Sequence, residues 1–94
     1  MDDGRFERFV HHQLGLTART AASYRAALHR AEKIVGLELG GEVDLVDFRR
    51  RLRTKARAAD VPDGSVSNLV AAVDAFARFI DANGLSAEAE ATGR

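Results

Sequence analysis

The sequence predicts an all-α fold, a compact bundle of four helices. With 94 residues the chain has the length of one domain, and a chain of this size can bury one modest core. Ala and Leu are prominent while aromatic residues make up only 6% of the chain, a composition that favours helices over sheets. Apolar residues also recur at spacings of three and four, which is the period of a helix with one buried face.

The first two helices are predicted over residues 3–14 and 18–35. The apolar positions of the first are Phe6, Phe9, Val10 and Leu14, and those of the second are Tyr24, Leu28, Ala31 and Val35. Gly15 is a stop signal after the first helix, and Gly36 ends the second. Thr17 is expected to cap the second helix, because its hydroxyl can accept a hydrogen bond from a free N–H of the next turn.

The third and fourth helices are separated by a turn that contains the only proline, Pro62. Asp44 is the expected N-cap of the third helix, which extends to about Ala59 with Leu45, Phe48, Leu52, Ala56 and Ala59 facing inward. Ser65 is expected to cap the fourth helix, which ends at Asn83. Its apolar residues cover more than one face, so we predict that it is the most buried helix; they are Val66, Leu69, Val70, Val73, Phe76, Ala77, Phe79 and Ile80.

The domain organisation is predicted to be one helical domain over residues 1–84, followed by a flexible tail or linker over residues 85–94. The last segment is rich in Ala and Glu and has no apolar periodicity. It therefore has no face with which to pack on a core.

The residue patterns of common catalytic and metal sites are absent from the sequence. The chain contains no Cys, which excludes disulfides and thiolate metal ligands. Gly40-Gly41 lacks the spacing and the following Lys of a phosphate-binding loop. His11 and His12 are adjacent, so on a helix they point roughly 100° apart and do not easily share a metal. We therefore predict no catalytic residue, no cofactor and no metal, and a chain that is not an enzyme.

No membrane segment is expected in this chain. The first residues include no apolar run of the kind found in secretory signals, and no apolar run approaches the roughly 20 residues that a membrane-spanning helix needs. We therefore expect a cytoplasmic protein with no membrane partner.

Positive charge is concentrated on the third predicted helix. Residues 48–58 contain no acid, and their basic residues are Arg49, Arg50, Arg51, Arg53, Lys55 and Arg57. Arg49, Arg53 and Arg57 are spaced by four and should form one row. This face has two interpretations: a solvated surface whose arginines pair with acids elsewhere, or a surface that contacts phosphates. Both stay open, because the chain has 14 acids to balance its 14 bases.

Three short segments form a pattern at the expected ends of the helices. The first helix contains Phe6-Glu7-Arg8-Phe9, and the turn into the second reads Gly15-Leu16-Thr17-Ala18-Arg19-Thr20, followed by Tyr24-Arg25 and Leu28. The fourth contains Gly64-Ser65-Val66-Ser67-Asn68, then Ala71-Ala72-Val73, Phe76, Arg78-Phe79 and Gly84. Over about residues 5–84 the chain resembles the N-terminal SAM-like (core-binding) domain of tyrosine recombinases, the phage-integrase family. Residues 23–32 also resemble helical domains fused at the front of restriction-type nucleases.

This resemblance implies a compact SAM-like bundle of four helices that grips duplex DNA, with catalysis in a separate C-terminal domain. In the family, the start of the second helix and the last helix face the DNA. Carried over to this chain, those positions are Thr17, Arg19, Thr20, Arg25, Ser65, Ser67 and Asn68. Tyr24 matches a core or near-core position and not the recombinase nucleophile. One difference is that the family has arginines near position 68 and at position 74, where this chain has Asn68 and Asp74.

The sequence thus leads to a non-catalytic domain that binds double-stranded DNA, mainly through the phosphate backbone. The expected contacts combine the basic third helix with the positions given by the resemblance: Thr17, Arg19, Thr20, Arg25, Arg49, Arg50, Arg53, Arg57, Ser65, Ser67 and Asn68. Such a domain would serve a catalytic domain or a partner elsewhere. The alternative is a helical module for protein–protein interaction or assembly, with the same basic face as its docking surface.

Overall fold

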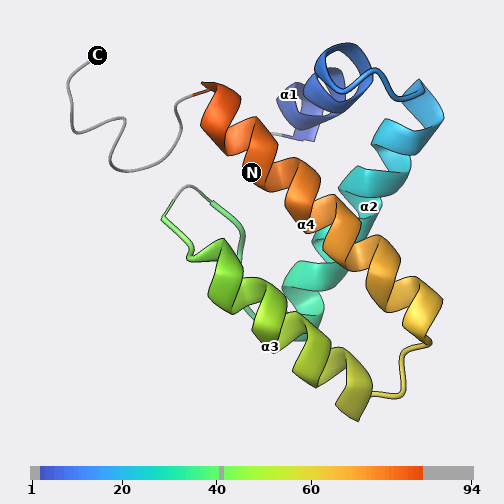
Figure 1. The fold of residues 1–94 in the computed structure, drawn as a ribbon, viewed down its shortest axis with the longest axis vertical. Helices are drawn as coiled ribbons and strands as arrows, with labels where there is room; N and C mark the ends of the chain where they lie inside the picture. Colours follow the sequence, from blue (N-terminus) through green and yellow to red (C-terminus); the bar gives the residue numbers. More distant parts are fainter. Residues whose placement is uncertain (1–2, 41, 84–94) are drawn as a thin grey trace.

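Four α-helices and one π-helical segment make up most of residues 3–40 and 42–83, which this computed structural model describes (Figure 1). The elements are α1 (Asp3–Arg8), η1 (Phe9–Gln13), α2 (Ala18–Val35), α3 (Leu45–Ala58) and α4 (Asp63–Asn83). Within these described residues there is no strand, and the prediction of an all-α bundle is confirmed. None of the helices in this part of the chain is long and apolar enough to cross a membrane. The predicted tail, residues 85–94, lies outside the described residues.

The starts of α2 and α3 are capped as the sequence predicts. The Thr17 hydroxyl accepts a hydrogen bond from the backbone N–H of Thr20 at 3.1 Å. The Asp44 carboxylate accepts from the N–H groups of Val46 at 3.0 Å and Asp47 at 3.2 Å. At the other end of α2, Gly36 has a φ of 84°, a left-handed conformation that glycine adopts without a steric penalty. These local signals fix both bounds of α2 and the start of α3.

The start of α4 differs from the prediction. The helix begins at Asp63, so Ser65 lies inside its first turn and is not the cap. The backbone carbonyl of Pro62 accepts the N–H of Val66 at 3.0 Å, which places the first helical hydrogen bond ahead of Ser65. Ala59 is also exposed rather than inward, because it is the C-cap residue where the chain leaves α3.

The first helix contains a π turn that the sequence pattern did not indicate. The N–H of Leu14 donates to the carbonyl of Phe9 at 3.2 Å, five residues earlier in the chain. The predicted inward residues Phe6, Phe9 and Val10 are buried, and Leu14 packs against the core from its edge. The wider turn therefore changes the local backbone without moving the apolar face away from the core.

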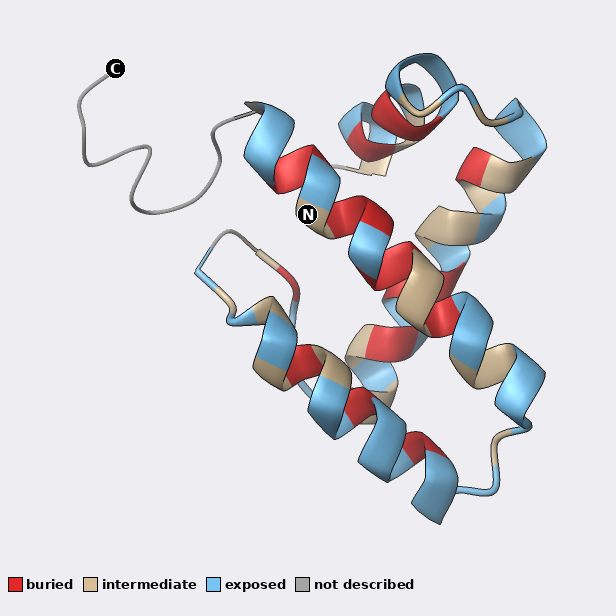
Figure 2. Ribbon diagram, in the orientation of Figure 1, coloured by how far each residue is buried: buried red, intermediate tan, exposed pale blue. Residues whose placement is uncertain are grey.

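The core lies along α4, which contacts every other element (Figure 2). Its buried residues are Leu69, Ala72, Val73, Ala75, Phe76, Phe79 and Ile80, more than any other helix provides, as the sequence predicts. Phe6 of α1 lies edge-on to Phe79 with ring centroids 5.8 Å apart, and it also contacts Phe76 at 6.1 Å. From α3 the buried residues are Phe48, Leu52 and Ala56.

The packing of α3 on α4 and of α2 on α4 determines which of their residues are neighbours at the surface. α3 and α4 lie side by side and run in opposite directions, because residues 59–62 connect them directly (Figure 1). α2 crosses α4 on the other side, and α1 packs against α2 near the far end of α4. α4 therefore packs against both α2 and α3, and part of its first half, including Ser67 and Asn68, is exposed.

Candidate functional site

The predicted arginine row of α3 follows the boundary with α4. At one end, Arg49 Nη1 lies 2.5 Å from Asp74 Oδ1 of α4 and is half-buried by this contact. Further along, Arg53 and Arg57 are exposed and line an open hollow together with Ser67 of α4. We call it the α3–α4 hollow; its lining residues are Arg53, Arg57, Asp60, Val61, Pro62, Asp63, Val66 and Ser67. The spacing of four therefore places Arg49, Arg53 and Arg57 in one row, but only Arg49 forms an ion pair with a described residue.

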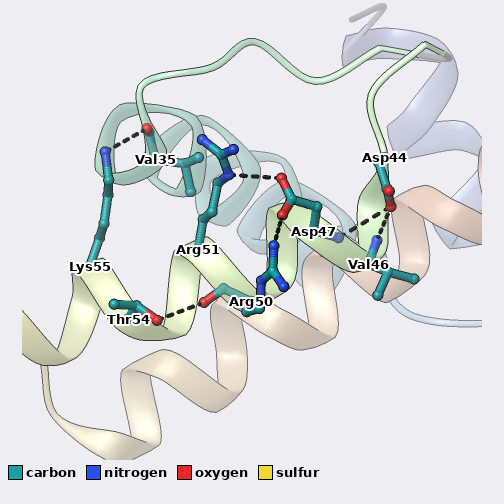
Figure 3. A network of polar contacts seen from close by, with 8 residues as sticks. All are labelled: Val35, Asp44, Val46, Asp47, Arg50, Arg51, Thr54 and Lys55. Carbon is teal, nitrogen blue, oxygen red and sulfur yellow. Dashed lines mark hydrogen bonds and ion pairs between the residues drawn. The ribbon is translucent and has the colours of Figure 1, made fainter.

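Three other basic residues of α3 are engaged within the fold (Figure 3). Arg51 Nε donates to Asp47 Oδ2 at 2.7 Å, and Arg50 pairs with the other carboxylate oxygen. Desolvation opposes the charged form of Asp47, but the hydrogen bonds and charges of Arg50 and Arg51 together lower the pKa of its carboxyl below the ordinary value. Lys55 Nζ donates to the last carbonyl of α2, that of Val35, at 3.1 Å.

The predicted residues at the start of α2 are also partly engaged. The hydroxyl of Thr17 donates to that of Thr20 at 3.0 Å, in addition to its capping contact. Arg25 points toward α1, where its Nη1 lies 2.7 Å from Oε1 of Glu7. Arg19 is exposed and makes no ion pair with any residue that the structure describes. Arg25 therefore differs from Arg19, because its guanidinium is paired with a carboxylate of α1.

One arginine that the prediction omitted lies beside α4. Arg30 of α2 and Asn68 of α4 are exposed and line a second open hollow, which we call the α2–α4 hollow. Its lining residues are Ser23, Ala26, Ala27, Arg30, Asn68 and Leu69. Arg30 follows Arg19 by about three helical turns, so both lie on the same side of α2. This spacing is visible in the sequence and could have identified Arg30.

The two hollows are lined by consecutive residues of α4. Ser67 lines the α3–α4 hollow, and Asn68 lines the α2–α4 hollow. Arg53 and Arg57 lie on one side of this segment and Arg30 on the other. None of these three arginines makes an ion pair within the part of the chain that is described. Ser65, also predicted, is half-buried one turn earlier.

Acidic residues also lie near this surface. Asp60 and Asp63 line the α3–α4 hollow with Arg53 and Arg57, and they reduce the positive potential there. Asp60 has a φ of 59°, the left-handed region, at the turn between α3 and α4. The hollow is therefore mixed in charge, with the arginines on α3 and the carboxylates at the turn.

The histidines lie away from the two hollows. His29 Nε2 is 2.9 Å from Asp3 Oδ2, and its Nδ1 is 3.1 Å from Glu32 Oε1. The hydrogen bond with Asp3 raises the pKa of His29 above its ordinary value, against some desolvation, and Glu32 adds to the increase. Among the described residues, no group of three or more His, Cys, Asp or Glu is arranged to hold a metal ion.

Comparisons with protein-family models, curated proteins and solved structures find no match for this chain. The resemblance to the core-binding domains of tyrosine recombinases therefore stays a prediction that rests on the short segments of sequence described above.

Proposed function

We propose that this chain is a non-catalytic DNA-binding domain that contacts the phosphate backbone of a duplex. The observation that carries the proposal is the arrangement around Ser67 and Asn68, where Arg30 flanks α4 on one side and Arg53 and Arg57 flank it on the other. Arginine suits this task because its planar guanidinium can give two parallel hydrogen bonds to phosphate oxygens. Such a domain would serve a catalytic domain or a partner elsewhere.

The proposed contacts divide into two groups by their partners in the fold. Arg19, Arg30, Arg53 and Arg57 can meet a phosphate without first losing an ion pair to a described residue. Arg25, Arg49 and Arg50 would have to exchange a carboxylate for a phosphate, which costs part of the gain. Ser67 and Asn68 offer uncharged hydrogen-bonding groups between the arginines, and Thr17 and Thr20 lie at the helix start next to Arg19.

A salt titration with matched variants tests this proposal. Arg53→Gln/Arg57→Gln removes two charges that have no ion pair with the described residues, while Arg50→Gln/Arg51→Gln removes two charges from the same helix that are paired with Asp47. Binding to a duplex is measured at several salt concentrations. We expect the first variant to flatten the log–log salt slope by about one unit for each phosphate that the protein no longer neutralises. The second variant should change the slope less.

Two results would contradict the proposal. The first is unmutated protein that binds duplex DNA no tighter than about 10⁻⁴ M at physiological salt, the weak end of non-specific association. The second is equal loss of affinity in the two variants, because it would mean that total charge matters and that Arg53 and Arg57, which have no ion pair with a described residue, have no special role.

An exposed apolar residue supports a second candidate function, a protein-interaction module. Val46, in the first turn of α3, is 70% exposed, and Arg50 follows it by one turn on the outer side of the helix. An apolar side chain beside basic ones fits an acidic partner with an apolar contact residue. Under this proposal Val46→Ser would abolish partner binding, whereas under the DNA proposal it would leave duplex affinity nearly unchanged.

A further inference from the structure

The side chain of Asn68 is exposed on α4, and its amide makes no hydrogen bond with a residue that the structure describes. Among the described residues that line the two hollows, it is the only amide. An amide has an acceptor oxygen beside an NH₂ donor. Asn68 can therefore form two hydrogen bonds with a group that also has a donor beside an acceptor.

Basic residues lie on both sides of this amide. Arg30 of α2 shares the α2–α4 hollow with Asn68, and Arg53 and Arg57 of α3 line the other hollow with Ser67. Cations on opposite sides of one helix suit the two phosphate strands that border a groove of duplex DNA. The major groove is about 12 Å wide and admits a helix, whereas the minor groove, about 6 Å wide, is too narrow. A helix held by these arginines in the major groove presents Asn68 to the base edges.

The surroundings of Asn68 on α4 suit a base edge better than a further phosphate. Gly64 and Ala71 lie about one turn before and after it, and their small size lets the helix approach the bases closely. Asp63 and Asp74 are exposed within two turns of it. Their carboxylates repel a phosphate more strongly than they repel the uncharged edge of a base.

We propose that Asn68 recognises an adenine in the major groove, an inference that rests on the proposed DNA-binding function. In this groove adenine presents the N6 donor beside the N7 acceptor, so the amide oxygen accepts from the first and the NH₂ group donates to the second. Guanine presents two acceptors there, O6 and N7, and leaves the amide oxygen without a donor. The arginines hold the phosphates and fix the helix, while Asn68 adds a preference at one base pair.

The first experiment selects tight binders from a pool of duplexes with randomised sequence, once with the unmutated chain and once with Asn68→Ala. Asn68 is exposed and Ala favours a helix, so the variant should keep the fold. We expect the unmutated chain to enrich adenine at one position and the variant to lose that enrichment. Because Asn68 carries no charge, the variant should keep the salt slope of binding to the unselected pool.

The second experiment changes the selected adenine and measures the affinity of single duplexes. Replacing its base pair with one that contains guanine should weaken binding of the unmutated chain roughly tenfold, as expected for the loss of one bidentate contact. 7-Deazaadenine, in which a C–H group replaces the N7 acceptor, should lose part of the same affinity. Neither change should weaken binding of Asn68→Ala. The control is Gln13→Ala, which removes an exposed amide from η1 and should respond to both changes as the unmutated chain does.

The outcomes separate this inference from the function on which it rests. Unmutated protein that binds duplexes with a steep salt slope but enriches no adenine would overturn the role of Asn68 and leave the DNA-binding proposal standing. Adenine enrichment that survives in Asn68→Ala would overturn it too. A loss of affinity in Asn68→Ala that is the same for every sequence would assign Asn68 to a phosphate instead. Unmutated protein that binds no duplex would overturn both proposals.

Discussion

Arginines that are neighbours in the sequence have different partners in the folded chain. Arg49 pairs with Asp74 of α4 and Arg50 with Asp47 of its own helix, while Arg53 is exposed beside the α3–α4 hollow. Exposed pairs of this kind contribute little to stability, about 0–1 kcal/mol. These ion pairs matter more for binding, because a paired guanidinium must leave its carboxylate before it can bind a phosphate.

Phe76 is the residue on which we expect the fold to depend most. It is 1% exposed, and its ring forms a cluster with those of Phe6 and Phe79, whose centroids lie 6.1 Å and 6.0 Å from its own. Phe76→Ala should destabilise the domain by about 3–5 kcal/mol, since it removes apolar packing and leaves a cavity. This is a large part of the stability of a small domain. Thermal unfolding followed by circular dichroism measures the effect.

The control for this prediction is Val46→Ala, which shortens an apolar side chain that is 70% exposed. We expect it to change the free energy of unfolding by less than about 0.5 kcal/mol. A Phe76→Ala protein with an unchanged melting temperature would contradict the packing described for α4.

At the scale of elements, local signals in the sequence predicted most helix bounds, but they did not predict which residues of different helices are in contact. Thr17 and Asp44 cap their helices as expected because a cap depends on a few adjacent residues. The predicted cap at Ser65 was wrong, since the carbonyl of Pro62 already begins α4. The pairing of Arg49 with Asp74 depends on how α3 sits against α4, and no local pattern encodes that register.

The attachment of α1 to α2 should depend on pH through His29. Both ring nitrogens face carboxylate oxygens, Nε2 toward Asp3 and Nδ1 toward Glu32, so only the protonated ring can donate to both. The folded state raises the pKa of His29, above all through the hydrogen bond with Asp3. The stabilisation is therefore complete below the unfolded pKa of about 6.5 and is lost as the pH rises through the higher folded value.

The measurement is the free energy of unfolding of the unmutated protein and of His29→Gln at about pH 5.5 and about pH 8.5, on either side of the ordinary histidine range. We expect the variant to be less stable at the lower pH, by at most about 1 kcal/mol because the side chain is 46% exposed, and to approach the unmutated protein at the higher pH. His12→Gln is the control, because His12 makes no ion pair with an acid in the described residues. A difference that is the same at both pH values would contradict the role of the charge.

At the scale of the whole molecule, the charge is balanced but unevenly placed. The formal net charge is zero, so overall charge does not draw the protein toward DNA. Under the proposed function, binding would come from the local surface that α2, α3 and α4 form together. The sequence predicted Arg53, Arg57, Ser67 and Asn68, yet it could not show that the last two lie between arginines from different helices. It also missed Arg30, whose position beside α4 follows from the crossing of α2 and α4.

If the chain binds DNA as proposed, this arrangement predicts that one duplex contacts both sides of α4. If Arg30 and Arg57 hold different phosphates, Arg30→Gln and Arg57→Gln should each weaken duplex binding, and the double variant should show the sum of the two reductions in binding free energy. We expect additivity within about 0.5 kcal/mol, as for sites that share no partner. Both arginines are exposed and have no ion pair among the residues described, so neither change should alter the fold. Fluorescence anisotropy with one labelled duplex at fixed salt measures all four affinities. A double variant no weaker than the worse single variant would mean that both arginines act on one phosphate. An Arg30→Gln protein with full affinity would place the duplex along α3 alone, because α2 would then contribute no contact beside Asn68.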